Sequence, residues 1–178
     1  MGRNKMLLDV DGAPMVRRAV LVARDAGLAP IVVVVGSDEA RVRDALDGIE
    51  CTFAVNSDFT GPTSGSLHAG LHALPDDVSA TVILLADMIR VTTPMLTALL
   101  QANSAGDAPL GASRYGDVLA PPLLFRRALW RELLAWHGEG CGKAVVTAHQ
   151  HEAEIHDWPA DALRDVDTPD DYRELVPQ

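Results

Sequence analysis

The sequence predicts an α/β domain of three layers, in which helices cover both faces of a predominantly parallel sheet. Two features indicate this class. Short apolar runs with the length of buried strands, such as IVVVV at 31–35, alternate with segments of helical periodicity. No internal repeat, low-complexity tract or change of composition divides the chain, so residues 1–178 are expected to form one domain.

The first half of the chain alternates regularly between helix and strand. Apolar residues recur at helical spacing over 13–27, and Gly27 is a natural stop. Ser37 is expected to cap the second helix, and Thr93 to cap a later one with Pro94 at its first position. After the strand at 31–35, the predicted elements are a helix at 38–47, a strand at 51–55, a helix at 64–74, a strand at 80–86 and a helix from Thr93 to about 102.

The second half is less regular. HEAEIHD at 151–157 alternates between polar and apolar residues, which is typical of an edge strand. The other elements predicted here are strands at about 110–114 and 122–125, helices at about 126–136 and 141–149, and a last helix after Pro169.

Composition excludes several classes of function. The formal net charge of −10 argues against a nucleic-acid partner, because binding to a phosphate backbone needs a basic surface. No apolar run approaches the roughly 18 residues of a membrane span, and no signal peptide opens the chain, so we expect a cytoplasmic protein without a membrane partner. The cysteines, Cys51 and Cys141, form no metal-binding or disulfide pattern.

Polar residues that follow the predicted strands are the candidates for chemistry, because open α/β sheets bind ligands beyond the carboxyl ends of their strands. Asp87 ends the apolar run TVILLAD, where a carboxylate can hold Mg²⁺ or simply cap a turn. In DVDTPDDY at 165–172, helix capping explains the later residues. It does not explain Asp165 and Asp167, one of which is a candidate second metal ligand.

Two glycine-containing segments can approach a nucleotide. Near the amino terminus, Gly2, Arg3 and Lys5 form a loop that can wrap phosphates with backbone amides and cations, unless it is a frayed end. In the segment 56–74, small residues open a predicted helix and allow close approach of a base or ribose, and Gly70 allows that helix to pack tightly on the sheet. An ordinary capped helix after a flexible loop would have the same pattern.

Other catalytic motifs are missing from the sequence. His68 and His72 have the spacing of a zinc pair but lack the glutamate beside the first histidine, so they are expected to face solvent or to form hydrogen bonds. There is no GxSxG, GxxxxGK[ST] or GxGxxG motif. His149, His151 and His156 are not assigned a metal.

These segments together resemble the molybdopterin guanylyltransferase-like NTP-transferase family, and most closely its molybdenum cofactor cytidylyltransferase branch. MGRNKMLL at 1–8 and DGAPMV at 11–16 are similar to the second half of the opening signature, LAAGxSxRMGxxK followed by LL and GxP. The family pattern N, G, SLxxGL is matched by Asn56, Gly61, Ser66, Leu67, Gly70 and Leu71. In the same order, LADMI at 85–89 resembles GDxP, APPLLF at 120–125 resembles PxLF, GEGCGK at 138–143 resembles GDxGAR, and DVDTPDDY resembles DIDTPEDY.

The resemblance implies a Rossmann-like nucleotidyltransferase fold and Mg²⁺-dependent transfer of a nucleoside monophosphate, with CTP as the first choice of NTP. It implies that Lys5 and the loop of Gly2 and Arg3 hold the phosphates, and that Asp87 holds Mg²⁺ with help from Asp167. The remaining implied roles place Asn56, Gly65, Ser66 and Gly70 at the nucleotide, and Arg114 and Lys143 at a phosphorylated acceptor such as the molybdopterin cofactor. A molybdoenzyme that receives the cofactor is a further implied partner.

The chain departs from the family pattern at three places. It starts at the Met of RMG, without the first strand, which is central to the family's sheet, so neighbouring strand edges and apolar faces are expected to be exposed. GDxP has become Ala86-Asp87-Met88-Ile89, and GDxGAR has Glu139 and Lys143 in place of Asp and Arg. Three alternatives therefore stay open: the same chemistry on another acceptor, a non-catalytic protein that binds or delivers a pterin cofactor, and an NAD(P)H-dependent oxidoreductase.

Overall fold

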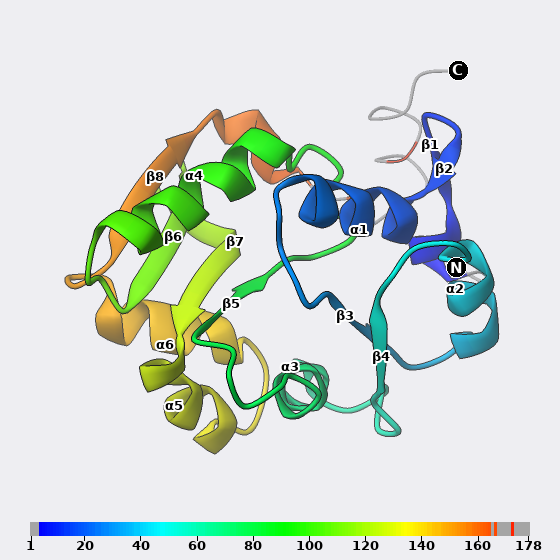
Figure 1. Cartoon of the computed structure of the whole chain (residues 1–178), viewed down its shortest axis with the longest axis horizontal. Coiled ribbons are helices and arrows are strands. Elements are labelled where there is room, and N and C mark those ends of the chain that lie inside the picture. Colours follow the sequence, from blue (N-terminus) through cyan, green and yellow to red (C-terminus); the bar gives the residue numbers. More distant parts are fainter. Residues whose placement is uncertain (1–3, 165, 167–171, 173–178) are drawn as a thin grey trace.

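The computed structural model describes residues 4–164, 166 and 172, and it confirms the α/β class. The strands β3 to β8 form a central layer, with α1 and α4 on one face and α3, α5 and α6 on the other, and the hairpin of β1 and β2 lies apart from it (Figure 1). The described helices are α1 (Met15–Asp25), α2 (Glu39–Ala45), α3 (Thr63–His72), α4 (Thr93–Ala105), α5 (Trp130–Ala135), α6 (Cys141–His149) and the 3-10 helices η1 (Lys5–Leu7), η2 (Arg127–Leu129) and η3 (Ala160–Leu163). None of the helices in this part of the chain is long and apolar enough to cross a bilayer.

Strand pairing is mixed, which corrects the expectation of a predominantly parallel sheet. The strands are β1 (Asp9–Val10), β2 (Ala13–Pro14), β3 (Val32–Val35), β4 (Thr52–Val55), β5 (Ala80–Ile83), β6 (Leu110–Tyr115), β7 (Val118–Arg126) and β8 (Glu154–Trp158). β3 pairs with β4 in parallel, and β6 with β8 in parallel, whereas β7 is antiparallel to both β5 and β6. The reason is the tight turn at Gly116, where φ is +61°, which sends β7 straight back between β5 and β6.

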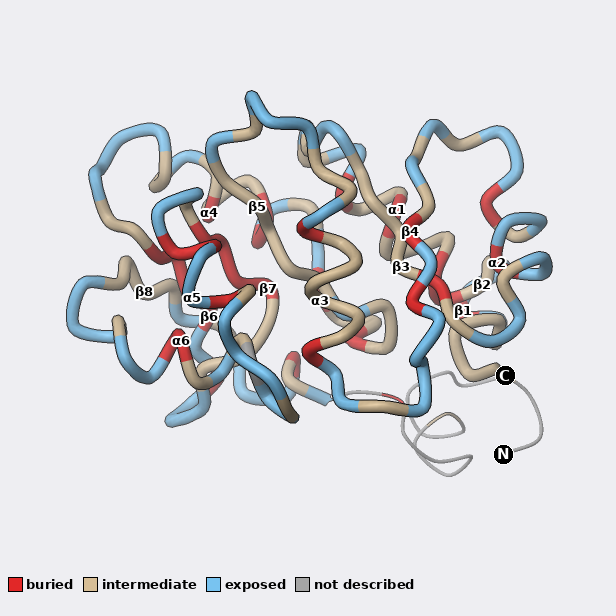
Figure 2. Tube along the Cα trace, turned by 90° about the horizontal axis from the view of Figure 1, so that it is seen from below, coloured by how far each residue is buried: buried red, intermediate tan, exposed pale blue. Residues whose placement is uncertain are grey.

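The sheet layer is divided between β3 and β5. β4 and β3 form one sheet, β5, β7, β6 and β8 form another, and no pairing joins the two among the described residues. All residues of β5 and three of the four in β3 are only half-buried, whereas β6 is almost fully buried (Figure 2).

Helix α3 spans this division. It contacts β3 and β4 on one side and α5 and α6 on the other, and both views place it between the two groups (Figures 1 and 2). A Cβ added at Gly70 would lie 3.1 Å from Cγ2 of Val34, so this glycine does allow the close packing on the sheet that the sequence predicts. Leu71, on the same helix, is buried in the core beneath the four-stranded sheet.

Element bounds agree closely with the sequence predictions, but two helix caps were placed wrongly. Helix α2 starts after Asp38, whose φ is +59° and which makes no side-chain capping bond, so Ser37 is not the cap. Thr93 is the first residue of α4 rather than its cap; Thr92 precedes it in extended conformation, with Pro94 in the first turn as expected. β8 lies at the edge of its sheet, as the alternation at 151–157 predicts.

Candidate active site

An ion pair between Lys5 and Asp87 lies at the carboxyl end of β5. Lys5 belongs to η1, and Asp87 follows β5 by four residues. The Lys5 ammonium lies 2.6 Å from Oδ2 of Asp87, and the two side chains are 32% and 15% exposed. The two residues predicted to be catalytic, 82 positions apart in the chain, are thus in direct contact.

The backbone around this pair is held by short-range capping and by contact with β3. The side chain of Asn4 accepts a hydrogen bond from the backbone N–H of Met6 at 3.1 Å, which caps η1. Its amide group donates to the carbonyl of Ser37 at 3.5 Å, immediately beyond β3. The carboxyl ends of β3 and β5 therefore both meet η1, which places the lysine at the edge of the sheet where ligands bind.

Val166 adjoins Asp87. The backbone N–H of Val166 donates to the carbonyl of Asp87 at 3.3 Å, and the Val166 side chain is fully buried beside Val10 and Met15. Asp165 and Asp167 lie outside the described residues, as do Gly2 and Arg3.

Asn56 joins the end of β4 to the first turn of α3. Its side chain is buried, its Nδ2 donates to Oγ of Ser66 at 3.0 Å, and its Oδ1 accepts from the backbone N–H of Asp58 at 3.0 Å. A Cβ added at Gly65 would lie 3.4 Å from Nδ2 of Asn56, in van der Waals contact, so Gly65 packs directly against this side chain. The predicted nucleotide residues Asn56, Gly65 and Ser66 are thus one connected group.

Arg114 lies at the same edge of the sheet but in a different environment. β5 and β6 are both antiparallel to β7, and Ile83 and Ala112 both pair with Leu123. Arg114 is two residues beyond Ala112, and therefore lies past the level at which β5 ends. Its guanidinium forms two hydrogen bonds to Asp157 of β8, at 2.5 and 2.8 Å, and these bonds lower the pKa of the Asp157 carboxyl.

Lys143 is exposed in the first turn of α6, directly after a loop that contacts α3. The backbone N–H of Ser64 donates to the carbonyl of Gly138 at 3.3 Å, and the Gly138 N–H donates to Oγ of Ser64 at 3.1 Å. The N–H of Thr63 donates to Oε2 of Glu139 at 3.3 Å. These contacts were missed from the sequence; the only signal for them is a Thr-Ser pair that opens a helix after a proline.

The family assignment follows from the match of the sequence to a known family, together with the polar residues at the carboxyl ends of the strands. The family described as "MobA-like NTP transferase domain" matches residues 1–153, which is most of the chain. The chain belongs to this MobA-like NTP transferase family. Its members are nucleotidyltransferases that use an NTP and an acceptor, in agreement with the fold and with the coarse activity predicted from the sequence.

Solved structures similar to this MobA-like chain agree with the assignment. Rv0371c from Mycobacterium tuberculosis H37Rv is 25% identical, with a TM-score of 0.88, over 100% of this chain and 91% of that one. The same protein in complex with manganese gives 26% identity and a TM-score of 0.80, over 99% of this chain and 94% of that one. The bifunctional protein GlmU of Cupriavidus pinatubonensis is 35% identical over 60% of this chain, but the match spans only 23% of GlmU.

The residues of the MobA-like chain can contribute to a divalent metal site at Asp87. Mg²⁺ typically takes one or two protein carboxylates and completes its shell with water and substrate phosphates. Asp87 supplies one partly buried carboxylate, already next to a cation. No group of three or more potential ligands occurs among the residues that the structure describes.

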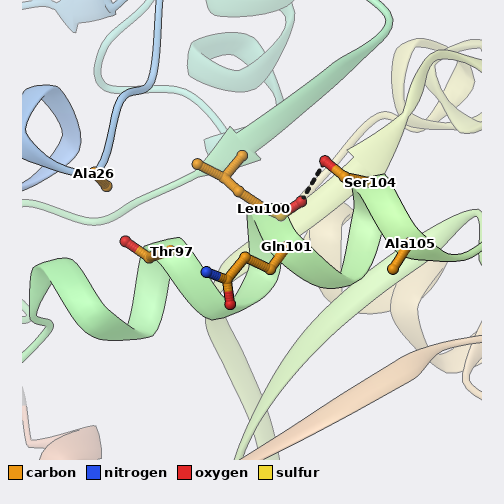
Figure 3. A pocket seen from close by; sticks show the side chains of 6 residues that line it. All are labelled: Ala26, Thr97, Leu100, Gln101, Ser104 and Ala105. Carbon is orange, nitrogen blue, oxygen red and sulfur yellow. Dashed lines mark hydrogen bonds between the residues drawn. The ribbon is translucent and has the colours of Figure 1, made fainter.

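A hollow on the outer face of α4 is not part of this edge. It has a volume of about 360 Å³ and is lined by Ala26, Thr97, Leu100, Gln101, Ser104 and Ala105, without a charged side chain (Figure 3).

His68, as expected, forms a hydrogen bond through its Nε2, 3.0 Å from the carbonyl of Leu133. Neither feature offers an alternative catalytic centre.

Proposed function

We propose that this chain transfers a nucleoside monophosphate, with CMP as the first choice, from an NTP to a phosphorylated acceptor of the molybdopterin type. The contact between Lys5 and Asp87 carries the proposal, because it brings the lysine of the phosphate loop to the carboxylate that would hold the metal. A lysine and a metal-binding carboxylate at one point are what an NTP triphosphate requires.

In the proposed reaction an oxygen of the acceptor phosphate attacks the α-phosphorus of the NTP. A new phosphorus–oxygen bond forms while the bond between the α-phosphorus and the bridging oxygen breaks, and pyrophosphate leaves with the electron pair. Lys5 holds the β- and γ-phosphates and neutralises charge that moves onto the leaving group. Asp87, with Asp167 as a second ligand, would hold Mg²⁺, which neutralises phosphate charge when it is bound.

The base and ribose are proposed to lie against the first turn of α3. Gly65 leaves the backbone accessible, and Ser66 is fixed by its hydrogen bond to Asn56. Gly2 and Arg3 would complete the phosphate loop, and Gly70 would act by keeping α3 close to the sheet. The choice of cytosine rests on the resemblance to the cytidylyltransferase branch.

The acceptor is proposed to lie between β6 and α6, where Arg114 and Lys143 supply positive charge to a chain whose formal net charge is −10. A phosphorylated pterin cofactor fits this chemistry, and a molybdoenzyme would then receive the product. An acceptor of another kind would use the same two cations, because their role is to bind phosphate.

Calorimetric titration with CTP, GTP and ATP, with Mg²⁺ and with EDTA, tests the proposal. We expect Mg²⁺-dependent binding that favours CTP at least tenfold, and release of pyrophosphate once a molybdopterin acceptor is added.

Each outcome separates the proposal from its alternatives. Binding that favours GTP or ATP would leave nucleotidyl transfer as the proposed reaction, but the proposed base would no longer be cytosine. Nucleotide binding without pyrophosphate release, with any acceptor offered, would indicate a binding or delivery protein. If the chain binds no NTP, nucleotidyl transfer is wrong, and NAD(P)H-dependent reduction of a dye becomes the next assay.

A further inference from the structure

The starts of α3 and α6 are joined by reciprocal hydrogen bonds, which we call the helix joint. The joint consists of Thr63 and Ser64 from α3 and of Gly138, Glu139 and Gly140 from the loop before α6. Besides the three bonds described above, the N–H of Gly140 donates to Oγ1 of Thr63 at 3.2 Å. These bonds link positions 74 to 77 residues apart, so they come from tertiary structure and not from local capping.

The joint satisfies groups that α3 cannot satisfy itself. The first N–H groups of a helix have no partner within it. Pro62, which precedes α3, makes no side-chain capping bond, so the N–H groups of Thr63 and Ser64 are satisfied by Glu139 and Gly138. Ser64 is the central member, because it is only 4% exposed and its N–H and Oγ both bond to Gly138.

The first turn of α3 is therefore held from two sides. On the side of β4, the buried side chain of Asn56 donates to Ser66. On the side of α6, Ser64 holds the loop that leads to Lys143. No strand pairing joins β3 to β5 in the described part of the chain. The packing of α1 against α4 and these contacts of α3 therefore hold the proposed nucleotide side against the proposed acceptor side.

We propose that Ser64 is a positioning residue for nucleotidyl transfer, with Glu139 as its support. This inference rests on the proposed function. Ser64 touches neither reacting group; it keeps Gly65 and Ser66 at a fixed place relative to the loop before Lys143. A misplacement of about 1 Å between reacting groups can lower a rate by about a hundredfold, so a loosened joint should slow transfer more than it weakens nucleotide binding.

Ser64→Ala tests the inference, with Ser104→Ala as the matched control. Ser104 is an exposed serine whose hydroxyl donates to Leu100 within α4, so its loss should change neither binding nor transfer. For Ser64→Ala we expect kcat to fall about tenfold while the Kd for the NTP changes less than twofold, since the contact between Asn56 and Ser66 remains. Glu139→Ala should lower kcat by a smaller factor, and Glu139→Gln should restore most of it, because an amide oxygen still accepts from Thr63.

Amide hydrogen exchange measures the joint without any substrate. In Ser64→Ala the N–H of Gly138 loses its acceptor and should exchange at least tenfold faster, and in Ser104→Ala it should not. Unchanged exchange at Gly138, or a kcat equal to that of the parent chain, would overturn the positioning role while leaving the proposed function intact. A parent chain that binds no NTP would overturn both the positioning role and the proposed function. Faster exchange at Gly138 in Ser64→Ala would still show that Ser64 and Gly138 form the hydrogen bond of the helix joint.

Discussion

Two cation–carboxylate pairs lie at the same edge of the sheet and differ in what brings them together. Arg114 and Asp157 are direct neighbours in the parallel pairing of β6 with β8, so the strand register alone places them side by side. Lys5 and Asp87 share no strand pairing; one lies in η1 and the other in the loop after β5. Strand pairing brings the first pair together, whereas the second pair forms only because η1 lies next to the loop after β5.

Exposure separates the pairs further. The side chains of Arg114 and Asp157 are 44% and 67% exposed, and those of Lys5 and Asp87 are 32% and 15% exposed. Charges that are partly removed from water interact more strongly with each other and with a bound triphosphate. We therefore propose the pair of Lys5 and Asp87 as the centre of the chemistry and the pair of Arg114 and Asp157 as peripheral to it.

The largest expected effect is the loss of Asp87. Asp87→Ala should lower kcat/KM for pyrophosphate release by about a thousandfold, because it removes the metal ligand that neutralises phosphate charge. Steady-state assays over a range of Mg²⁺ concentrations would measure this, and the Mg²⁺ dependence of NTP binding should disappear. Asp157→Ala is the matched control and should change kcat/KM less than threefold; equal losses in both variants would contradict the comparison.

The next largest effect concerns the cation of the same pair. Lys5→Met keeps the length of the side chain but not its charge, and we expect about a hundredfold loss in kcat/KM, because the leaving pyrophosphate loses a cation. Lys5→Arg should recover only part of this, since a guanidinium has a different geometry. Single-turnover assays with saturating NTP would separate binding from transfer. A Lys5→Met variant with the parent rate would remove Lys5 from the mechanism.

The contrast between these pairs also shows what the sequence could predict. A long apolar run followed by Asp87 predicts a carboxylate just beyond a strand. The strand, β5, ends at Ile83, four residues earlier, and it is half-buried and antiparallel to β7. Gly70 could be assigned a packing role from its place in a helix beside a sheet. Local patterns of this kind depend on a few neighbouring residues, and the structure bears both out.

Contacts between residues that are far apart in the sequence could not be predicted from local patterns. The distance from Lys5 to Asp87 depends on how η1 is held by Asn4 at the end of β3. The helix joint depends on Gly138 reaching Ser64, and neither residue type predicts that partner. The antiparallel course of β7 was missed because a strand covered on both faces has the same apolar pattern in either direction.

A smaller effect is expected when Arg114 loses its charge. Arg114→Gln should raise the KM for a phosphorylated acceptor by about tenfold, equivalent to about 1.4 kcal/mol, and leave the Kd for the NTP unchanged. Asp157→Asn frees the guanidinium and should lower that KM or leave it unchanged. Acceptor titrations at saturating NTP would measure both. If Arg114→Gln leaves the KM for the acceptor unchanged, Arg114 serves only the pairing of β6 with β8.

The smallest effect is the pH dependence of the exposed pair. The hydrogen bonds from Arg114 lower the pKa of the Asp157 carboxyl in the folded protein below its ordinary value of 3.8. A lowered folded-state pKa contributes stability that is fully present above the unfolded-state pKa and is lost as the pH falls through the folded-state pKa. The contribution of this pair should therefore be constant from neutral pH down to about pH 5, begin to decline near about pH 4, and be lost as the pH falls further through the lowered folded-state pKa.

Urea unfolding of the parent chain and of Asp157→Asn, which cannot titrate at this position, would isolate that contribution. Other carboxylates lower the stability of both proteins in acid, so the quantity to follow is the difference between their unfolding midpoints. We expect a small difference near pH 7 that starts to close near about pH 4 and is lost as the pH falls through the lowered folded-state pKa. High salt should reduce it, because both side chains are largely exposed. A difference that widens in acid would mean that protonation of Asp157 stabilises the folded protein. Arg114 would then be available to an acceptor without competition from the Asp157 carboxylate.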